Sequence, residues 1–314
     1  MIPGDHVPRL LLLSAALAAM VAAPAPARAG QTGVIVPSYF YPGTGGPGGV
    51  GDGWAAMTAA AGKVPITAVL NPASGPGSSE DPIYANAMTS LENAGGKVVA
   101  YVFTNNGNAP LATVEGQINT YITQYGSLIK GFFLDGMFLL PGTLSYYQSI
   151  DSYIKSLSPS YTVIGNPGQP FLNGLLPTDY LTAADIVNIF EGPNKAPAPG
   201  AAGFDAYPYG LNWFLGYPSD RFSNIVFDVP GSDLLADLNK AVGLNAGHVY
   251  ITDGTLPNPY SQLPSYWDQE VAAIHGLNSI PEPGSLALMA AGAALSVGLI
   301  VPWRRALGRT RGAR

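Results

Sequence analysis

The chain has 314 residues, no cysteine, 39 glycines and 29 prolines, and its formal net charge is −6. Without cysteine it has neither a disulfide framework nor a thiolate metal site. Residues 30–280 carry 18 acidic and seven basic side chains, a balance of −11 that disfavours nucleic acid as a partner. This charge favours either a cationic substrate, such as a sugar polymer with free amines, or simply solubility.

Residues 1–29 have the pattern of a secretory signal peptide. Arg9 precedes an apolar run over residues 10–23, and the small-residue site Ala27-Arg28-Ala29 follows it. The alternative is a membrane anchor that is retained, but the run is short for spanning a bilayer. We expect cleavage after Ala29 and an exported domain over residues 30–280.

Within that domain, apolar, β-rich runs recur about every 30 residues. Eight of them are predicted strands: Val34–Tyr41, Val64–Asn71, Val98–Thr104, Gly131–Phe138, Thr162–Asn166, Ile186–Glu191, Asn224–Val229 and His248–Asp253. Five segments between them have the apolar spacing or start signals of helices: Asp81–Asn93, Val114–Tyr125, Thr143–Leu157, Ser232–Val242 and Ser265–Leu277.

Strands that alternate with helices and lack a polar face predict a parallel sheet covered on both sides. A doubly wound sheet meets the same conditions. We expect a single (β/α)8 TIM barrel, because there are eight predicted strands. The active site of such a barrel lies in the loops after the strands.

Two acidic residues end buried runs: Asp135 in Gly131-Phe-Phe-Leu-Asp and Glu191 in Asn188-Ile-Phe-Glu. Packing does not explain them, because burying an ion without a partner is costly. A loop cap or a lysine partner is the structural alternative. Cleavage of a glycosidic bond needs two carboxyl groups on one sugar, and alternate strands of a barrel direct side chains into the same mouth. Asp135 and Glu191 are therefore the candidate catalytic pair, and apolar neighbours are expected to raise the pKa of the less solvated acid.

Six further polar or aromatic residues lie at predicted strand ends and are candidates for substrate binding. Each has a structural alternative: packing for the tyrosines, turn formation for the asparagines, and capping or loop contacts for the aspartates. They are Tyr39, Tyr41, Asn71, Asn166, Asp228 and Asp253. The three histidines are scattered, and the chain has no zinc pattern, Gly-x-Ser-x-Gly elbow or Walker-type loop. We therefore expect no metal and no cofactor.

Residues 281–314 form a distinct C-terminal segment. Pro281-Glu282-Pro283 is followed by an uncharged run to Val301 and then by a cluster of arginines. A run of about 18 apolar residues just spans a bilayer, and arginines hold its end on the cytoplasmic side. The segment resembles a PEP-CTERM sorting signal, which implies a transmembrane helix processed by an exosortase in a bacterium that exports polysaccharide. An ordinary membrane anchor is the alternative. Both place the domain outside the cytoplasmic membrane, at first anchored and then, after processing, extracellular or on the cell surface.

Six short segments in order resemble the spherulation-specific (spherulin-4-like) family: 36–42, 70–77, 100–102, 131–135, 166–168 and 190–191. The resemblance implies a (β/α)8 barrel and endo-acting cleavage of α-1,4-linked galactosamine or N-acetylgalactosamine polymers. It further implies that Asp135 is the nucleophile and Glu191 the acid/base of a retaining glycoside hydrolase.

The chain departs from the family pattern at one position. The fungal polysaccharide hydrolases of the family usually have Asp-Glu at the end of strand four, whereas here Gly136 follows Asp135. If the missing glutamate is catalytic, the protein is slow or inert. The alternative hypothesis is therefore a non-catalytic protein of the biofilm matrix that binds the polysaccharide without cutting it.

Overall fold

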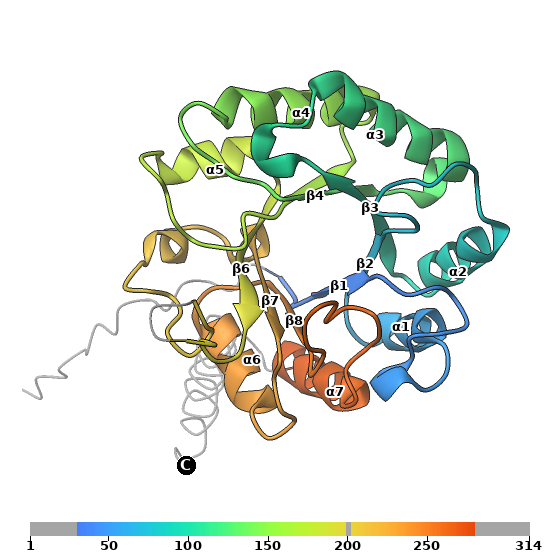
Figure 1. The fold of residues 1–314 in the computed structure, drawn as a ribbon. Helices are drawn as coiled ribbons and strands as arrows, with labels where there is room; N and C mark the ends of the chain where they lie inside the picture. The colour runs from blue at the N-terminus through green and yellow to red at the C-terminus, as the bar shows by residue number, and fades with distance from the viewer. Residues whose placement is uncertain (1–29, 199–201, 280–314) are drawn as a thin grey trace, which may run out of the picture.

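The computed structural model describes residues 30–198 and 202–279. Eight parallel strands follow one another around a barrel in chain order, with helices outside them (Figure 1). This order confirms the predicted α/β barrel. The strands are β1 Val34–Ser38, β2 Ile66–Leu70, β3 Lys97–Phe103, β4 Gly131–Asp135, β5 Thr162–Gly165, β6 Ile186–Pro193, β7 Phe222–Phe227 and β8 His248–Ile251.

The described residues contain seven α-helices rather than eight. Five match the predicted helical segments: α2 Pro82–Asn93, α3 Leu111–Tyr125, α4 Leu144–Leu157, α6 Leu234–Gly243 and α7 Trp267–Asn278. The sequence did not predict α1 Gly53–Ala61, which is rich in alanine, or α5 Pro177–Ala183, which has only seven residues. Between β6 and β7 the described chain forms 3-10 turns at Trp213–Gly216 and Ser219–Arg221.

The barrel is nearly closed, and its seam lies between β1 and β8. Gly33 bridges to His248, and the Val249 N–H donates to the Gly33 carbonyl at 2.9 Å. Nearer the mouth, the Ile251 N–H donates instead to Oε1 of Glu270 on α7, at 2.8 Å. Glu270 is fully buried, and burial raises the pKa of its carboxyl well above the usual value. A helix side chain thus takes over the role that a strand carbonyl has elsewhere in the sheet.

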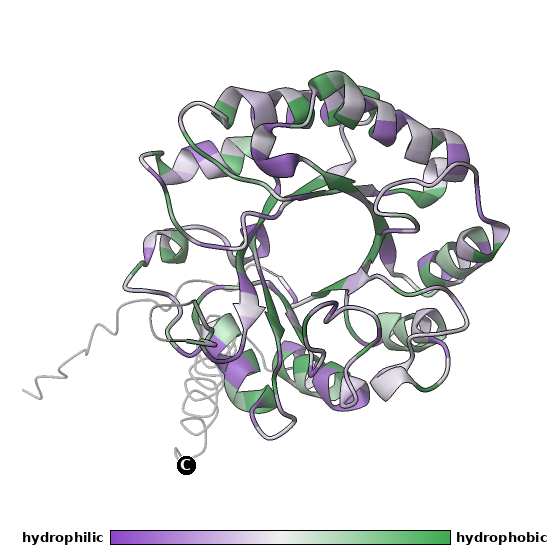
Figure 2. Ribbon diagram, viewed as in Figure 1, coloured by the Kyte–Doolittle hydropathy of each residue, from purple (hydrophilic) through white to green (hydrophobic). Residues whose placement is uncertain are grey.

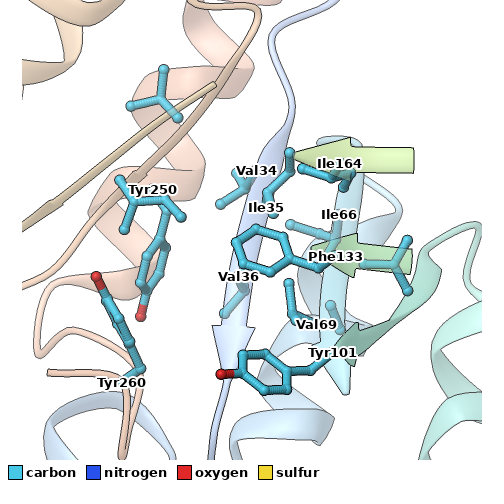
Figure 3. Close-up of a cluster of buried hydrophobic side chains, with 14 of the residues drawn as sticks. Val34, Ile35, Val36, Ile66, Val69, Tyr101, Phe133, Ile164, Tyr250 and Tyr260 are labelled. Carbon is cyan, nitrogen blue, oxygen red and sulfur yellow. The ribbon is translucent and has the colours of Figure 1, made fainter. Parts of the chain in front are cut away.

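An apolar interior closes the barrel below its mouth. The strands are the most hydrophobic part of the ribbon, as expected for a parallel sheet covered on both faces (Figure 2). Inside, Ile35, Val69 and Phe133 are almost completely buried, and Tyr101, Tyr250 and Tyr260 are directed into the same space (Figure 3). Because this layer is packed, a polymer has access only to the loop end of the strands.

The predicted signal peptide and sorting signal lie outside the described residues. Across residues 30–198 and 202–279, no helix has both the length and the apolar character needed to cross a membrane.

Candidate active site

Asp135 is the last residue of β4, and donors from two neighbouring strands hold its carboxylate. The Tyr101 hydroxyl, on β3, donates to Oδ2 at 2.7 Å. The amide nitrogen of Asn166, just after β5, donates to Oδ1 at 2.8 Å. Strand parity explains the first contact, because Phe103 pairs with Asp135 in register and Tyr101 lies two residues earlier on the same face. Both bonds orient the carboxylate.

Glu191 reaches the barrel interior because β6 contains a bulge. The pairing with β7 shifts between Asn188 and Phe190, which leaves Ile189 without a partner. Residues three apart on a regular strand face opposite sides, whereas here Asn188 and Glu191 both contact Asn166. The extra residue therefore turns the Glu191 carboxylate into the mouth.

Gly168 holds the bulge from the neighbouring loop. Its N–H donates to the Asn188 carbonyl and its carbonyl accepts from the Glu191 N–H, both at 3.0 Å. Gly168 has a φ of +65°, and a Cβ there would lie 3.4 Å from the Glu191 Cβ. The turn after β5 therefore orients Asn166 and also fixes the backbone of Glu191.

A single side chain connects the two acids. Nδ2 of Asn166 donates to Oδ1 of Asp135 at 2.8 Å and to Oε2 of Glu191 at 2.5 Å. These two carboxyl oxygens are therefore no further apart than the sum of the two distances, about 5.3 Å. Asp135 and Glu191 are both partly exposed, whereas Asn166 is only 6% exposed. The predicted pair lies together on one partly open surface, above a buried amide.

The environment of Glu191 favours its protonated form. Burial, followed by the charge of Asp135, raises the pKa of the Glu191 carboxyl, and hydrogen bonds from Tyr260 and Asn166 oppose that rise. The Tyr260 hydroxyl donates to Oε1 at 2.7 Å. Burial and the nearby acids also raise the pKa of the Tyr101 and Tyr260 hydroxyls, which therefore remain protonated donors at neutral pH.

Aromatic rings surround the pair on the β1 side. Tyr39 packs edge-on against Tyr101 and against Tyr260, with a centroid distance of 5.7 Å to each. Burial, then the charges of Asp135 and Glu191, raise the pKa of the Tyr39 hydroxyl well above its usual value. Tyr39 is thus a predicted binding residue that the structure brings to the two acids.

Asn166 is also the last member of a buried polar chain. Its side chain contacts that of Asn188 at 2.8 Å, and Asn188 contacts the Ser223 hydroxyl on β7 at 3.0 Å. Asn188 and Ser223 are almost fully buried. Buried polar groups are stable only when they are paired, so the chain fixes the orientation of the Asn166 amide.

Among the described residues, no hydrogen bond joins four of the predicted binding residues to either acid, and their role in binding stays a prediction. The Tyr41 hydroxyl donates to Asp81 at 2.9 Å, and Oδ1 of Asn71 accepts from the Gly75 N–H at 3.0 Å within its own loop. Asp228 is exposed, with a φ of +57°. Asp253 accepts hydrogen bonds from the N–H and hydroxyl of Ser265 and so closes the loop between β8 and α7. Asn71 and Asp253 thus make the turn and loop contacts that were the structural alternatives to substrate binding.

Sequence reasoning missed Tyr101, Tyr260 and Asn188 as site residues. Tyr101 and Asn188 lie within apolar strands. A polar side chain at an inward-facing position of such a strand is the sequence feature that could have indicated a site residue. Tyr260 lies in a loop rich in proline and asparagine, where no periodicity indicates direction. In the described ranges, no group of three or more His, Cys, Asp or Glu side chains is arranged to hold a metal ion.

The family model of spherulation-specific family 4 matches residues 33–274, which include both acids and nearly the whole barrel. The chain belongs to this family. A curated member, spherulin-4 of Physarum polycephalum, is 34% identical over 259 residues, which cover 78% of this chain and 70% of that protein.

Structural comparison supports the same fold for this family member. The crystal structure of Aspergillus clavatus Sph3 in complex with GalNAc aligns with a TM-score of 0.61 and 24% identity. The alignment covers 78% of this chain and 98% of Sph3. A cyclic α-maltosyl-(1→6)-maltose hydrolase from Arthrobacter globiformis aligns more weakly, with a TM-score of 0.49, 11% identity and coverage of 79% and 81%. The chain therefore shares the TIM barrel fold of Sph3.

Proposed function

We propose that this protein is an exported, endo-acting glycoside hydrolase that cleaves α-1,4-linked galactosamine or N-acetylgalactosamine polymers with retention of configuration. The observation that carries the proposal is the Asn166 amide that joins Asp135 to Glu191. Retaining glycosidases hold their two carboxyl groups about 5–5.5 Å apart, whereas inverting enzymes need about 6.5–9.5 Å. The limit of about 5.3 Å between the bridged oxygens supports the retaining arrangement. The GalNAc bound to the related Sph3 supports the sugar class.

In the first step, Asp135 attacks the anomeric carbon while Glu191 gives its proton to the departing glycosidic oxygen. The bond from carbon to the leaving oxygen breaks as the bond to the aspartate oxygen forms, which gives a glycosyl ester. Tyr101 and Asn166 orient the attacking carboxylate through their hydrogen bonds. The raised pKa of Glu191 favours the protonated form that this step requires.

In the second step, the now ionised Glu191 takes a proton from water, and the water oxygen replaces the aspartate on the anomeric carbon. Two inversions give net retention. The Tyr260 hydroxyl, which donates to Glu191, stabilises the carboxylate formed between the two steps.

The substrate itself requires a nucleophile from the protein. In an α-linked N-acetylgalactosamine unit, the 2-acetamido group is cis to the leaving oxygen and has no access to the opposite face. Participation by the substrate is therefore excluded by stereochemistry, and Asp135 fills that role.

The test is turnover of a partly deacetylated galactosamine polymer, followed by mass spectrometry of the released oligosaccharides. Asp135→Asn and Glu191→Gln are each expected to lose most activity. Their thermal unfolding midpoints are expected to stay the same as that of the wild type. Proton NMR of the first product is expected to show the α-anomer. Full turnover by both variants would refute the assignment, and a first-formed β-anomer would refute retention.

The same experiment distinguishes a glycoside hydrolase from the alternative, a non-catalytic polysaccharide-binding protein of the biofilm matrix. A matrix protein that binds without cutting gives a measurable affinity for the polymer and no oligosaccharides. Gly136 motivates this alternative, but the proposed mechanism needs only Asp135 and Glu191.

Export and membrane processing are part of the proposal. We propose that residues 1–29 are a signal peptide and that an exosortase acts on residues 281–314. The barrel would then be located where exported polysaccharide is found. Mass spectrometry of the mature protein from its native host is expected to show an N-terminus at Gly30 and loss of the C-terminal segment. An intact chain in the cytoplasm contradicts this part alone.

A further inference from the structure

Phe103 has a position that packing does not explain. It is the last residue of β3, and its side chain is 44% exposed. Alternate residues of a strand face the same side, so Phe103 points to the side of Tyr101, whose hydroxyl contacts Asp135. Phe103 also pairs directly with Asp135 in the sheet register. A large apolar ring is therefore exposed at the barrel mouth, beside the proposed nucleophile.

Gly136 makes room for this ring. It follows Asp135 with a φ of +61°, and a Cβ at this position would lie 2.7 Å from Cε2 of Phe103. The edge of the ring thus lies against a stretch of backbone that has no side chain. Since nearly half of Phe103 is exposed, the rest of the ring is free to meet a ligand. Where fungal relatives usually carry a second acid, this chain presents an aromatic surface.

The C–H groups on one side of a pyranose ring form an apolar surface whose extent depends on configuration, and aromatic side chains bury such surfaces favourably. In a galacto-configured ring, the hydrogens on C3, C4 and C5 lie on one face because the C4 hydroxyl is axial on the other. In a gluco-configured ring the C4 hydrogen lies on the opposite face, so the C–H surface over C3, C4 and C5 is interrupted. An exposed phenylalanine beside the nucleophile therefore offers a larger contact to a galacto-configured ring than to a gluco-configured one.

We propose that Phe103 is the platform on which one of the two sugars flanking the scissile bond stacks, and that it selects galacto- over gluco-configured rings. This inference rests on the proposed function and adds a specificity-determining residue to it. It also gives Gly136 a role, since the glycine admits the ring instead of supplying a second acid.

The experiment measures affinity in full-length protein carrying Glu191→Gln, so that substrate is bound and not consumed. Isothermal titration uses an α-1,4-linked galactosamine tetrasaccharide and the corresponding glucosamine tetrasaccharide. Adding Phe103→Ala or Phe103→Leu is expected to weaken binding of the galactosamine sugar about tenfold, the size of a lost aromatic contact. Binding of the glucosamine sugar is expected to change much less, and Phe103→Trp is expected to keep the preference.

Leu157→Ala is the matched control. Leu157 is 42% exposed but ends α4, at the opposite end of the barrel, so its loss removes similar apolar surface without touching the mouth. Urea unfolding checks that each variant is folded. Unchanged affinity for both sugars in folded Phe103→Ala and Phe103→Leu would overturn the platform and leave the proposed function standing. No binding of either sugar by Glu191→Gln alone would overturn the proposed function and the platform with it.

Discussion

The hydroxyl of Tyr260 donates a 2.7 Å hydrogen bond to Oε1 of Glu191, 69 positions earlier in the chain. The ring of Tyr260 also packs edge-on against Tyr39. One residue of the loop between β8 and α7 therefore completes both the polar and the aromatic surroundings of the proposed acid/base.

Tyr260→Phe removes only the hydroxyl and is expected to raise the pKa of Glu191 further, because this hydrogen bond favours the carboxylate. Loss of protonated Glu191 sets the alkaline limb of kcat/KM in the proposed mechanism. That limb should move to higher pH, since the Glu191 carboxylate loses a hydrogen bond that stabilises it.

The measurement is the pH profile of kcat/KM on galactosamine polymer. Tyr153→Phe is the control, because the Tyr153 hydroxyl donates to Asn119 on the outside of the barrel. An alkaline limb that stays in place or moves to lower pH contradicts the role given to Tyr260.

Asn166→Ala is expected to lower kcat about 100-fold, because the variant loses a preorganised donor that holds both acids at a fixed separation. The two carboxyl groups then repel each other without the amide between them. KM should change less than kcat, since the amide orients the acids rather than the polymer. Steady-state kinetics test this, with Asn86→Ala on the exposed face of α2 as the control. If Asn166→Ala turns over substrate like the wild type, the bridge has no catalytic importance.

The barrel and its acidic pair were predictable for a simple physical reason. A strand covered on both faces is a nearly continuous apolar run, so a carboxylate at its end is conspicuous. Gly131-Phe-Phe-Leu-Asp135 carries this signal in five residues. The helices with clear apolar spacing were equally visible, whereas α1 is alanine-rich and gives no stripe.

The rest of the site depends on geometry that one strand does not encode. The bulge at Ile189 decides which way Glu191 points, and it becomes visible only when β6 is paired with β7. Tyr260 reaches the acids through the fold of a loop. The contact between Phe103 and Gly136 likewise joins two strands, so the sequence shows a missing acid and not the ring that lies there.

Gly136→Ala is expected to destabilise the protein by about 1–2 kcal/mol, the usual cost of a left-handed conformation for a residue with a Cβ. The backbone has little freedom to relax, because the Gly136 carbonyl accepts from the Asn106 N–H at 2.9 Å and from the Thr104 hydroxyl at 2.8 Å. The new methyl group also meets the Phe103 ring.

Urea unfolding measures this cost, with Gly142→Ala as the control. Gly142 lies in the same connection between β4 and α4, and a Cβ there has no atom within 4 Å. Adding Phe103→Ala to Gly136→Ala is expected to recover the part of the cost that comes from the ring, so the two changes should not be additive. Strict additivity contradicts the contact between ring and backbone.

His248 gives the fold a pH dependence of definite sign. It begins β8 at the seam beside Gly33, and burial lowers the pKa of its imidazole from 6.5 to about 4. Between these values the unfolded chain binds a proton and the folded chain does not, so its contribution to stability is complete above pH 6.5 and is lost as the pH falls toward 4. A shift of this size corresponds to about 3 kcal/mol.

His248→Gln should therefore lose less unfolding free energy than the wild type between pH 7 and pH 4. Urea titration at each pH measures this loss. His275→Gln, on the exposed end of α7, controls for loss of an imidazole. Parallel pH profiles for His248→Gln and wild type would mean that the seam tolerates a charged imidazole. The comparison is informative because the raised pKa values of the Glu191 and Glu270 carboxyls act in the opposite direction and are common to both proteins.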